Sequence, residues 1–386
     1  MKITQFHNRY IFPGGEDAVA SGEAALLRSN GHEVIAYHRA NKEADSFSLA
    51  QRAGFYLRDA FFSRKTYDEV RGLLARERPD IAHFHNAFFM IGPAAYQACF
   101  DAGVPVVQTL HNFRFLCANG VFYRDGHPCQ DCLSLGVGAG IRHGCWHDSV
   151  PATFWMTRVI GEYEKRGILK KIARFIVLGE FSKSRFLAAG WPLEKLLVKP
   201  NALDVDPGVA PYRGAYVLYA GTFQSYKGVQ TLLKAWAARS WPVPLKLAGS
   251  GPLEASLRGL NGPGVEFLGQ QPADEVMALI RGASCVVVPS ECYENFPRVI
   301  LEAYACGVPV VASRLGAMEE LVHSGETGAL FTPGDAQDLG RQLDVMLSDP
   351  AAAGRMGERA RAVFEERFTS GAVYRRMMDI YEQARR

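Results

Sequence analysis

The chain has 386 residues, which is long enough for two domains that each bury a hydrophobic core. Its formal net charge of +3 is nearly balanced, so bulk electrostatics give no reason to expect a nucleic-acid partner. No run of 18 apolar residues is present, and the first residues have the pattern of a strand rather than of a signal peptide. We therefore expect a cytoplasmic protein whose eight cysteines are thiols or metal ligands, not disulfides.

The amino terminus has the pattern of a βαβ unit. Residues 2–6 form a predicted strand, an alanine-rich helix ends near residue 30, and residues 34–37 form the next strand. A double glycine, Gly14-Gly15, opens the helix and would let the backbone approach a ligand closely, at a helix end that favours anions. By itself this signal is weak, because most such glycine pairs are simply turns.

Residues 51–78 mix aromatic and basic side chains. Such a segment could lie on an anionic membrane surface. The favoured interpretation is a helical hairpin that packs its aromatic residues into the core and leaves its arginines in solvent.

Two histidines follow predicted strands. His85 is the last residue but one of the stretch 79–86, and His111 is the last residue but one of the stretch 104–112. Loops at the carboxyl ends of parallel strands line the ligand crevice, so both histidines stand where function would be. A single histidine in such a place is nevertheless more often structural.

The most unusual local feature is a group of cysteines in an insertion at residues 113–148. A CxxC pair lies between two single cysteines, and four thiolates suit a closed, tetrahedral structural zinc site. The segment has too little apolar periodicity to build a core of its own, so a bound metal would be needed to stabilise it. Reduced thiols or disulfides are the alternative. The predicted ligands are Cys117, Cys129, Cys132 and Cys145, with His127, His143 and His147 as substitutes.

A Pro- and Gly-rich stretch, residues 204–214, fits a linker to the second domain. The strand 216–221 then leads through a turn that carries Lys227 into a helix at 229–238. The strand at 245–248 ends in a turn with Gly249 and Gly251, which is no Walker A loop because no Gly-Lys-Ser/Thr follows. We expect these glycines to permit a close approach to a nucleotide.

The stretch 285–316 is a strand–turn–helix–strand unit. Pro297 is predicted as the first helical residue, and Gly307 ends the helix. Free N–H groups at residues 296–299 can bind an anion. Glu294 and Glu302 flank that site, which suits a ligand with hydroxyls on both sides of a diphosphate, such as a nucleotide sugar. Two solvated glutamates are the plain alternative.

The two glutamates form an E-x7-E pair inside ENFPRVILEAYACGVPVV. That string resembles the donor-site signature of retaining GT-B glycosyltransferases of the GT4 family. Asn295 departs from it, since the family usually has glycine there. The resemblance extends more weakly over nearly the whole chain. It implies two Rossmann-like, doubly wound domains facing across a cleft.

The implied boundaries are an acceptor domain at residues 1–203, which carries the cysteine insertion, and a donor domain at 204–370. A helix at 371–386 would cross back to the first domain.

The resemblance also implies the reaction, which is transfer of a sugar from a UDP- or GDP-linked donor with retained anomeric configuration and no metal required for catalysis. Glu302 would bind the ribose and Glu294 the donor sugar, while Lys227 would neutralise the leaving diphosphate. His111 would act near the anomeric carbon. Thr222 stands where the family usually has a second cation, an arginine.

The implied site divides into three groups. The catalytic residues are His111, Lys227 and Glu294, and the acceptor side has Asp17 and His85. The donor-binding residues are Gly14, Gly15, Lys227, Gly249, Gly251, Asn295, Phe296, Pro297, Arg298 and Glu302. The acceptor would be a glycan, a lipid-linked sugar or a small molecule, with peripheral membrane contact if it is a lipid. A GT-B epimerase or hydrolase, or a non-catalytic nucleotide-sugar-binding protein, is the alternative.

Overall fold

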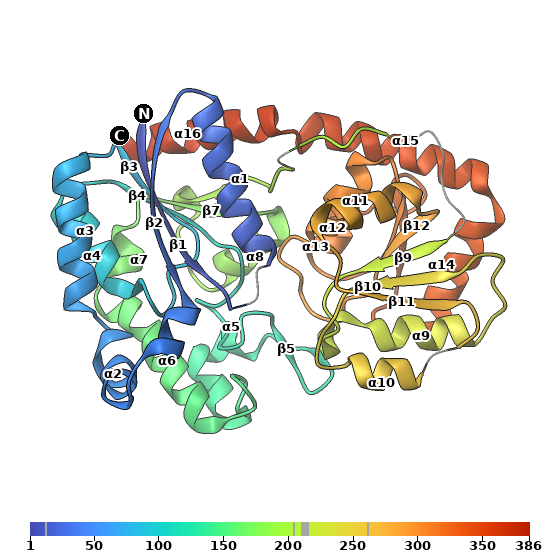
Figure 1. The fold of residues 1–386 in the computed structure, drawn as a ribbon, viewed down its shortest axis with the longest axis horizontal. Helices are drawn as coiled ribbons and strands as arrows, with labels where there is room; N and C mark the ends of the chain where they lie inside the picture. The colour runs from blue at the N-terminus through green and yellow to red at the C-terminus, as the bar shows by residue number, and fades with distance from the viewer. Residues whose placement is uncertain (12–13, 204, 210–215, 261) are drawn as a thin grey trace. The chain divides into compact units, whose positions relative to one another are not determined.

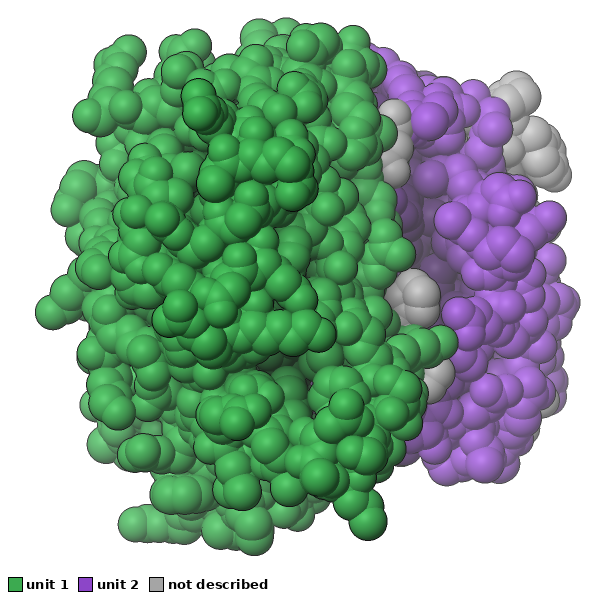
Figure 2. Space-filling view, turned by 60° about the vertical axis from the view of Figure 1, so that its left-hand side comes forward, with its two compact units in different colours: residues 1–120, 131–204, 373–386 green, residues 121–130, 205–372 purple. Residues whose placement is uncertain are grey.

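The computed structural model describes residues 1–11, 14–203, 205–209, 216–260 and 262–386. Its contacts divide the chain into two compact units. Unit 1 holds residues 1–120, 131–204 and 373–386, and unit 2 holds residues 121–130 and 205–372 (Figure 2). Residues 204 and 210–214 of the predicted linker lie outside the described residues.

Unit 1 is built on a parallel sheet of six strands in the order β2-β1-β3-β4-β7-β8 (Figure 1). The strands are β1 (Lys2–Arg9), β2 (Glu33–Ala40), β3 (Ile81–Phe84), β4 (Val106–Thr109), β7 (Arg174–Val177) and β8 (Leu196–Val198). The strand order reverses between β1 and β3, which is where open α/β sheets bind ligands.

The helices of unit 1 are α1 (Gly15–Ser29), α2 (Leu49–Gly54), α3 (Arg64–Glu77), α4 (Gly92–Asp101), α5 (Asp131–Leu135), α6 (Val150–Lys165), α7 (Ile168–Lys171), α8 (Glu180–Ala188) and α16 (Ser370–Arg385). The last of these returns from the end of the chain. Met377, Ile380 and Tyr381 of α16 are buried in one core cluster with Ile3 and Ile81 of the sheet. The carboxyl-terminal helix is thus part of the core of unit 1.

Unit 2 is built on a second parallel sheet, in the order β11-β10-β9-β12-β13-β14. Its strands are β9 (Val217–Ala220), β10 (Leu245–Ala248), β11 (Val265–Gly269), β12 (Cys285–Val288), β13 (Val310–Ser313) and β14 (Gly328–Phe331). Read from β9 as the first strand, this is the 3-2-1-4-5-6 order of dinucleotide-binding sheets. The expectation of two Rossmann-like domains is confirmed.

The helices of unit 2 are α9 (Val229–Ala237), α10 (Glu254–Gly259), α11 (Ala273–Gly282), α12 (Arg298–Ala305), α13 (Ala317–Leu321), α14 (Ala336–Ser348) and α15 (Pro350–Arg367). The prediction that Pro297 is the first helical residue is wrong. Pro297 has extended backbone angles (φ −71°, ψ 106°) and is the N-cap, so the helix begins at Arg298. Gly307 follows the helix with φ 69°, as a glycine stop requires.

The cysteine insertion is divided between the units. Its hairpin, β5 (Tyr123–Arg124) and β6 (His127–Pro128), belongs to unit 2. There the ring of Tyr123 lies 5.9 Å from that of Tyr226, and the ring of Phe122 lies 6.4 Å from that of Tyr293. This part of the insertion therefore packs beside the turns that follow β9 and β12.

The basic–aromatic segment forms α2, a π-helical turn (Phe55–Asp59) and α3. Phe61 and Phe62 are half-buried, as the favoured interpretation requires, whereas Tyr56 and Leu57 are 54% and 81% exposed. Among the described helices, none combines the length and the apolar character needed to span a bilayer.

Candidate functional site

In unit 2 the predicted donor residues gather around the turns after β9 and β12, the two neighbouring strands where the sheet order reverses. The ammonium of Lys227 lies 2.5 Å from Oε1 of Glu294. The hydroxyl of Ser290 donates to the same oxygen at 2.6 Å. The fold thus joins two predicted catalytic residues that are 67 positions apart in the chain.

This pair is charged and largely sheltered, with the Lys227 and Glu294 side chains 26% and 15% exposed. Burial alone would lower the pKa of Lys227, but the attraction of Glu294 outweighs it and raises that pKa above its ordinary value. Burial alone would raise the pKa of Glu294, but Lys227 and the Ser290 hydroxyl lower it. Both groups are therefore ionised at neutral pH.

The amino terminus of α12 adds a second cation. Nε of Arg298 lies 3.3 Å from Oε1 of Glu302, one helical turn away. Nη1 of Arg298 is buried and has no hydrogen-bond partner among the described residues. Burial raises the pKa of Glu302, although Arg298 acts in the opposite direction. A guanidinium with a free buried nitrogen at a helix amino terminus is well suited to a phosphate.

The residues before α12 are sheltered. Asn295 is buried, and the ring of Phe296 packs 6.0 Å from that of Phe368. Pro297 caps the helix. Thr222, which stands at the usual arginine position, is exposed.

The glycines of the second turn are required by a close contact within the chain. A Cβ on Gly249 would lie 1.8 Å from the carbonyl oxygen of Gly221, and a Cβ on Gly251 would lie 2.7 Å from that of Phe223. The turn after β10 is thus pressed against the turn after β9. This contact is a sufficient reason for both glycines, independent of any nucleotide.

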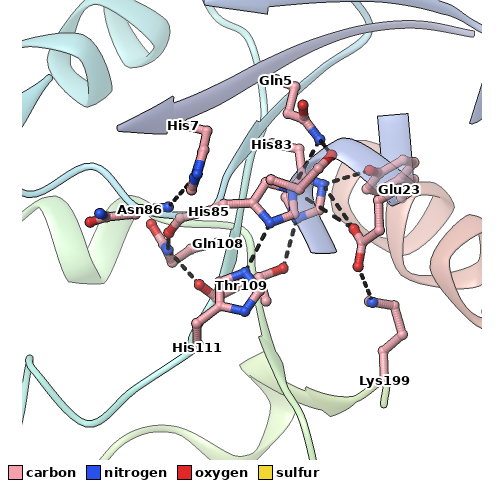
Figure 3. Close-up of polar contacts among 12 residues, drawn as sticks. Gln5, His7, Glu23, His83, His85, Asn86, Gln108, Thr109, His111 and Lys199 are labelled. Carbon is pink, nitrogen blue, oxygen red and sulfur yellow. Dashed lines mark hydrogen bonds and ion pairs between the residues drawn. The ribbon is translucent and has the colours of Figure 1, made fainter. Parts of the chain in front are cut away.

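In unit 1 the predicted residues His85 and His111 also meet, at the carboxyl ends of β3 and β4 (Figure 3). Nδ1 of His85 lies 2.9 Å from Nε2 of His111, with the two rings stacked at 20°. Nε2 of His7 lies 2.8 Å from Oδ1 of Asp17. Gly14 caps α1 and its N–H donates to Oδ2 of Asp17, while Gly15 is the first helical residue.

Beneath this cluster lies a buried ion pair that the sequence analysis did not predict. Nζ of Lys199 lies 2.5 Å from Oε1 of Glu23, and both side chains are buried. The other carboxylate oxygen, Oε2, lies 3.8 Å from Nε2 of His85 and 4.0 Å from Nδ1 of His83. His83 also contacts Oγ1 of Thr109 at 2.8 Å and the hydroxyl of Tyr381 at 2.7 Å.

His83, His85 and His111 are neutral. Burial lowers the pKa of His83 to about 4, and nearby Lys199 acts in the same direction. For His85 and His111 burial again dominates, and the pKa of each is held well below its ordinary value. For Asp17, burial acts to raise the pKa, but the bonds from His7 and Gly14 outweigh it and the pKa is lowered.

A small cavity adjoins His111. It measures about 10 Å³, roughly the room one water needs, and it is lined by residues that include Glu16, Asn86 and His111. Burial raises the pKa of Glu16 above its ordinary value.

Three of the predicted zinc ligands, Cys117, Cys132 and Cys145, belong to unit 1. The thiols of Cys117 and Cys132 are hydrogen-bonded, and Cys145 is near enough to act on Cys132 electrostatically, so the pKa of Cys132 is raised. Cys129 belongs to unit 2. All eight cysteines are free thiols.

Sequence reasoning missed Gln5, Glu23, His83, Lys199 and Ser290. One signal was available for His83, because strand alternation places it on the same face as His85. The others come from distant segments whose meeting only the fold decides.

Two Rossmann-like units, one with cations and carboxylates around the turns at its switch point, have the architecture of the GT-B class. The comparisons agree. Residues 13–207 match the family model described as Glycosyltransferase Family 4, and residues 207–363 match Glycosyl transferases group 1. The chain is 32% identical to glycogen synthase of Mycobacterium tuberculosis over 324 residues, which cover 80% of this chain and 70% of that protein. The protein therefore belongs to the group 1, family 4 glycosyltransferases.

Two further likenesses are more limited. The chain is 33% identical to N-acetyl-alpha-D-glucosaminyl L-malate synthase of Bacillus anthracis over 172 residues, 43% of this chain and 44% of that enzyme. It thus spans less than half the length of several curated relatives it matches. The crystal structure of Anabaena HepE in complex with UDP superposes with a TM-score of 0.71 at 19% identity, covering 98% of this chain and 99% of that one. At that identity the likeness establishes the fold.

Proposed function

We propose that this glycosyltransferase moves a sugar from a nucleotide diphosphate sugar to a hydroxyl acceptor with retention of the anomeric configuration and without a catalytic metal. The observation that carries the proposal is the cluster of Lys227, Glu294, Arg298 and Glu302 around the switch point of unit 2. It offers cations for a diphosphate and carboxylates for hydroxyls within one sheltered site.

Each group has a distinct task. Lys227 and the free nitrogen of Arg298 stabilise the charge that develops on the leaving diphosphate, so that Arg298 compensates for Thr222. Glu302 accepts hydrogen bonds from the ribose, and Glu294 accepts them from the donor sugar when Lys227 turns to phosphate. His111 donates a hydrogen bond near the anomeric carbon. Asp17 and His85 lie on the acceptor side.

The first experiment is a thermal-shift panel of UDP, GDP, TDP and ADP and their sugars. UDP is the leading choice, because HepE has been solved with UDP and with UDP-glucose. One nucleotide should stabilise the wild type but not Glu302→Ala. Glu275→Ala, which removes an exposed carboxylate from α11 of the same unit, should behave like the wild type. If no nucleotide stabilises the protein, the donor site is refuted.

Turnover then separates the related activities. A transferase consumes the donor rapidly only with an acceptor present, and NMR of the product reports the anomer. A hydrolase or epimerase consumes or converts the donor alone, and a binding protein leaves it intact in every mixture. Full activity after chelation supports metal-independent catalysis, and its loss contradicts it.

We also propose a structural zinc on the cysteine insertion, supported by the hydrogen-bonded thiols of Cys117 and Cys132 and by the electrostatic effect of Cys145 on Cys132. Purified protein should contain about one zinc per chain, and Cys132→Ser should lose it. Protein that is fully folded and free of zinc would contradict this site.

For the location of the protein we propose the cytoplasm, with peripheral contact at the membrane. The membrane contact is supported by an exposed apolar group, Leu49, Tyr56 and Leu57, which lies near the exposed Arg52 and Arg58 in the sequence. The wild type should float with vesicles rich in anionic lipid, and Leu57→Asp should float less. Equal flotation of the two proteins would refute the contact.

A further inference from the structure

The amide of Gln5 sets the protonation pattern of the buried histidines. Its Nε2 lies 2.8 Å from the carbonyl oxygen of Ala20, which can only accept a hydrogen bond. This end of the side chain must therefore be the NH₂ group. The opposite end agrees, because Oε1 of Gln5 lies 3.2 Å from Nε2 of His38, which can donate to it.

The second N–H of the same amide faces His85. Nε2 of His85 lies 3.2 Å from Nε2 of Gln5, so this ring nitrogen accepts and carries no proton. A neutral imidazole has one proton, which His85 must then hold on Nδ1. That nitrogen lies 2.9 Å from Nε2 of His111, which accepts in turn. The proton of His111 is thereby placed on its Nδ1.

The surroundings keep these rings neutral. His85 is buried and His111 is half-buried, and the ammonium of Lys199 disfavours further positive charge on both. The carboxylate of Glu23 favours a positive charge on these rings less than its position suggests, because its Oε1 is already paired with Lys199. Oε2 has no hydrogen-bond partner among the described residues and lies too far from both His85 and His83 for a hydrogen bond.

A metal ion is the competing explanation, since the ligand atoms of Glu23, His83 and His85 lie within 4.8 Å of one another. Three observations oppose it. Lys199 already neutralises the carboxylate, His83 has polar contacts at both ring nitrogens, and the amide of Gln5 occupies Nε2 of His85. Adding a divalent cation beside a buried ammonium would be costly.

We propose that His85 is a positioning residue that holds His111 in the tautomer with its proton on Nδ1, so that His111 meets the substrate as a neutral hydrogen-bond donor. This inference rests on the proposed role of His111 in glycosyl transfer. The group recognised is an oxygen that accepts a hydrogen bond, either a sugar hydroxyl or a phosphate oxygen. We call the hydrogen-bonded chain of Gln5, His85 and His111 the lock. Nε2 of Gln108 supports it by donating a hydrogen bond to the backbone carbonyl oxygen of His85 at 2.7 Å.

The test is long-range ¹H–¹⁵N NMR of full-length protein labelled with ¹⁵N-histidine, with signals assigned by single substitutions. In the wild type, His85 and His111 should both show a protonated Nδ1 and an unprotonated Nε2. His85→Phe keeps a ring but frees His111, whose nitrogen shifts should move toward averaged values. Turnover of the donor chosen by thermal shift should fall about tenfold to a hundredfold in kcat, with little change in the KM for donor.

Controls separate the interpretations. His323→Phe removes an exposed imidazole in unit 2 and should alter neither measurement. If His85→Phe fails to fold, Gln5→Met removes the amide donor and should also release the tautomer of His111. A wild-type His111 protonated on Nε2 overturns the proposal. So does one bound metal ion per chain whose removal shifts Nε2 of His85. If His111→Asn keeps full turnover while the tautomers are as expected, the proposed role of His111 fails and the lock stands.

Discussion

Replacing Lys227 with methionine removes both its contact as counter-ion of Glu294 and its proposed role as diphosphate ligand. The substitution keeps the apolar stem and removes the ammonium 2.5 Å from Glu294. Breaking a fully buried ion pair costs about 3–5 kcal/mol. Because these side chains keep 26% and 15% exposure, we expect a loss of about 2 kcal/mol in the free energy of unfolding. Turnover should fall on the order of a hundredfold.

The stability loss should depend on pH. Without Lys227, burial raises the folded-state pKa of Glu294 above its unfolded value, so the cost is present at neutral pH and shrinks as the pH falls through that folded pKa. Urea unfolding at pH 7.5 and pH 5 measures this change. Lys234→Met removes an exposed lysine from α9 and should affect neither stability nor turnover.

The double variant Lys227→Met/Glu294→Gln decides between the roles. It removes the unpaired charge, so most of the stability should return, while turnover should stay low because both proposed ligands are gone. Nucleotide release from the donor is the assay. If turnover returns together with stability, Lys227 serves only as a counter-ion for Glu294 and the proposed role is refuted.

Three further predictions concern stability, each measured by urea unfolding. Lys199→Met should lower the free energy of unfolding by about 3–5 kcal/mol, because it leaves the carboxylate of Glu23 buried without its partner. Adding Glu23→Gln should recover most of that loss. A Lys199→Met variant as stable as the wild type would contradict the ion pair. His83, with a pKa of about 4, should make the protein less stable by about 3 kcal/mol as the pH falls from 6.5 to 4, because the unfolded chain then binds a proton that the folded chain refuses. A His83→Phe variant should show a shallower decline, and an identical slope would count against neutral burial. Gly228→Ala should cost about 3 kcal/mol, because its Cβ would lie 1.8 Å from the carbonyl oxygen of Pro289 at φ 68°, whereas Gly259→Ala on open α10 should be neutral.

Local sequence pattern was sufficient to predict most strands of the two sheets and the turn between β12 and α12. Apolar strands, glycine stops and the E-x7-E string lie within short windows, where periodicity and turn chemistry act without help from the rest of the chain. The helix start was misplaced by one residue at Pro297, since a proline fits both the cap and the first turn. The alternation of strands and helices also predicted βαβ units, and the resemblance to the family implied the doubly wound class.

The sequence by itself therefore determined the family, the two Rossmann-like sheets and the residues His111, Lys227, Glu294 and Glu302 as candidates. Only the tertiary structure decided which side chains meet. It paired Lys227 with Glu294 across 67 residues and Lys199 with Glu23 across 176. It also brought Tyr381 of the last helix to His83 of the third strand. Such contacts depend on strand order and on which loops emerge at one edge of a sheet, and hydrophobic periodicity along the chain carries no information about either.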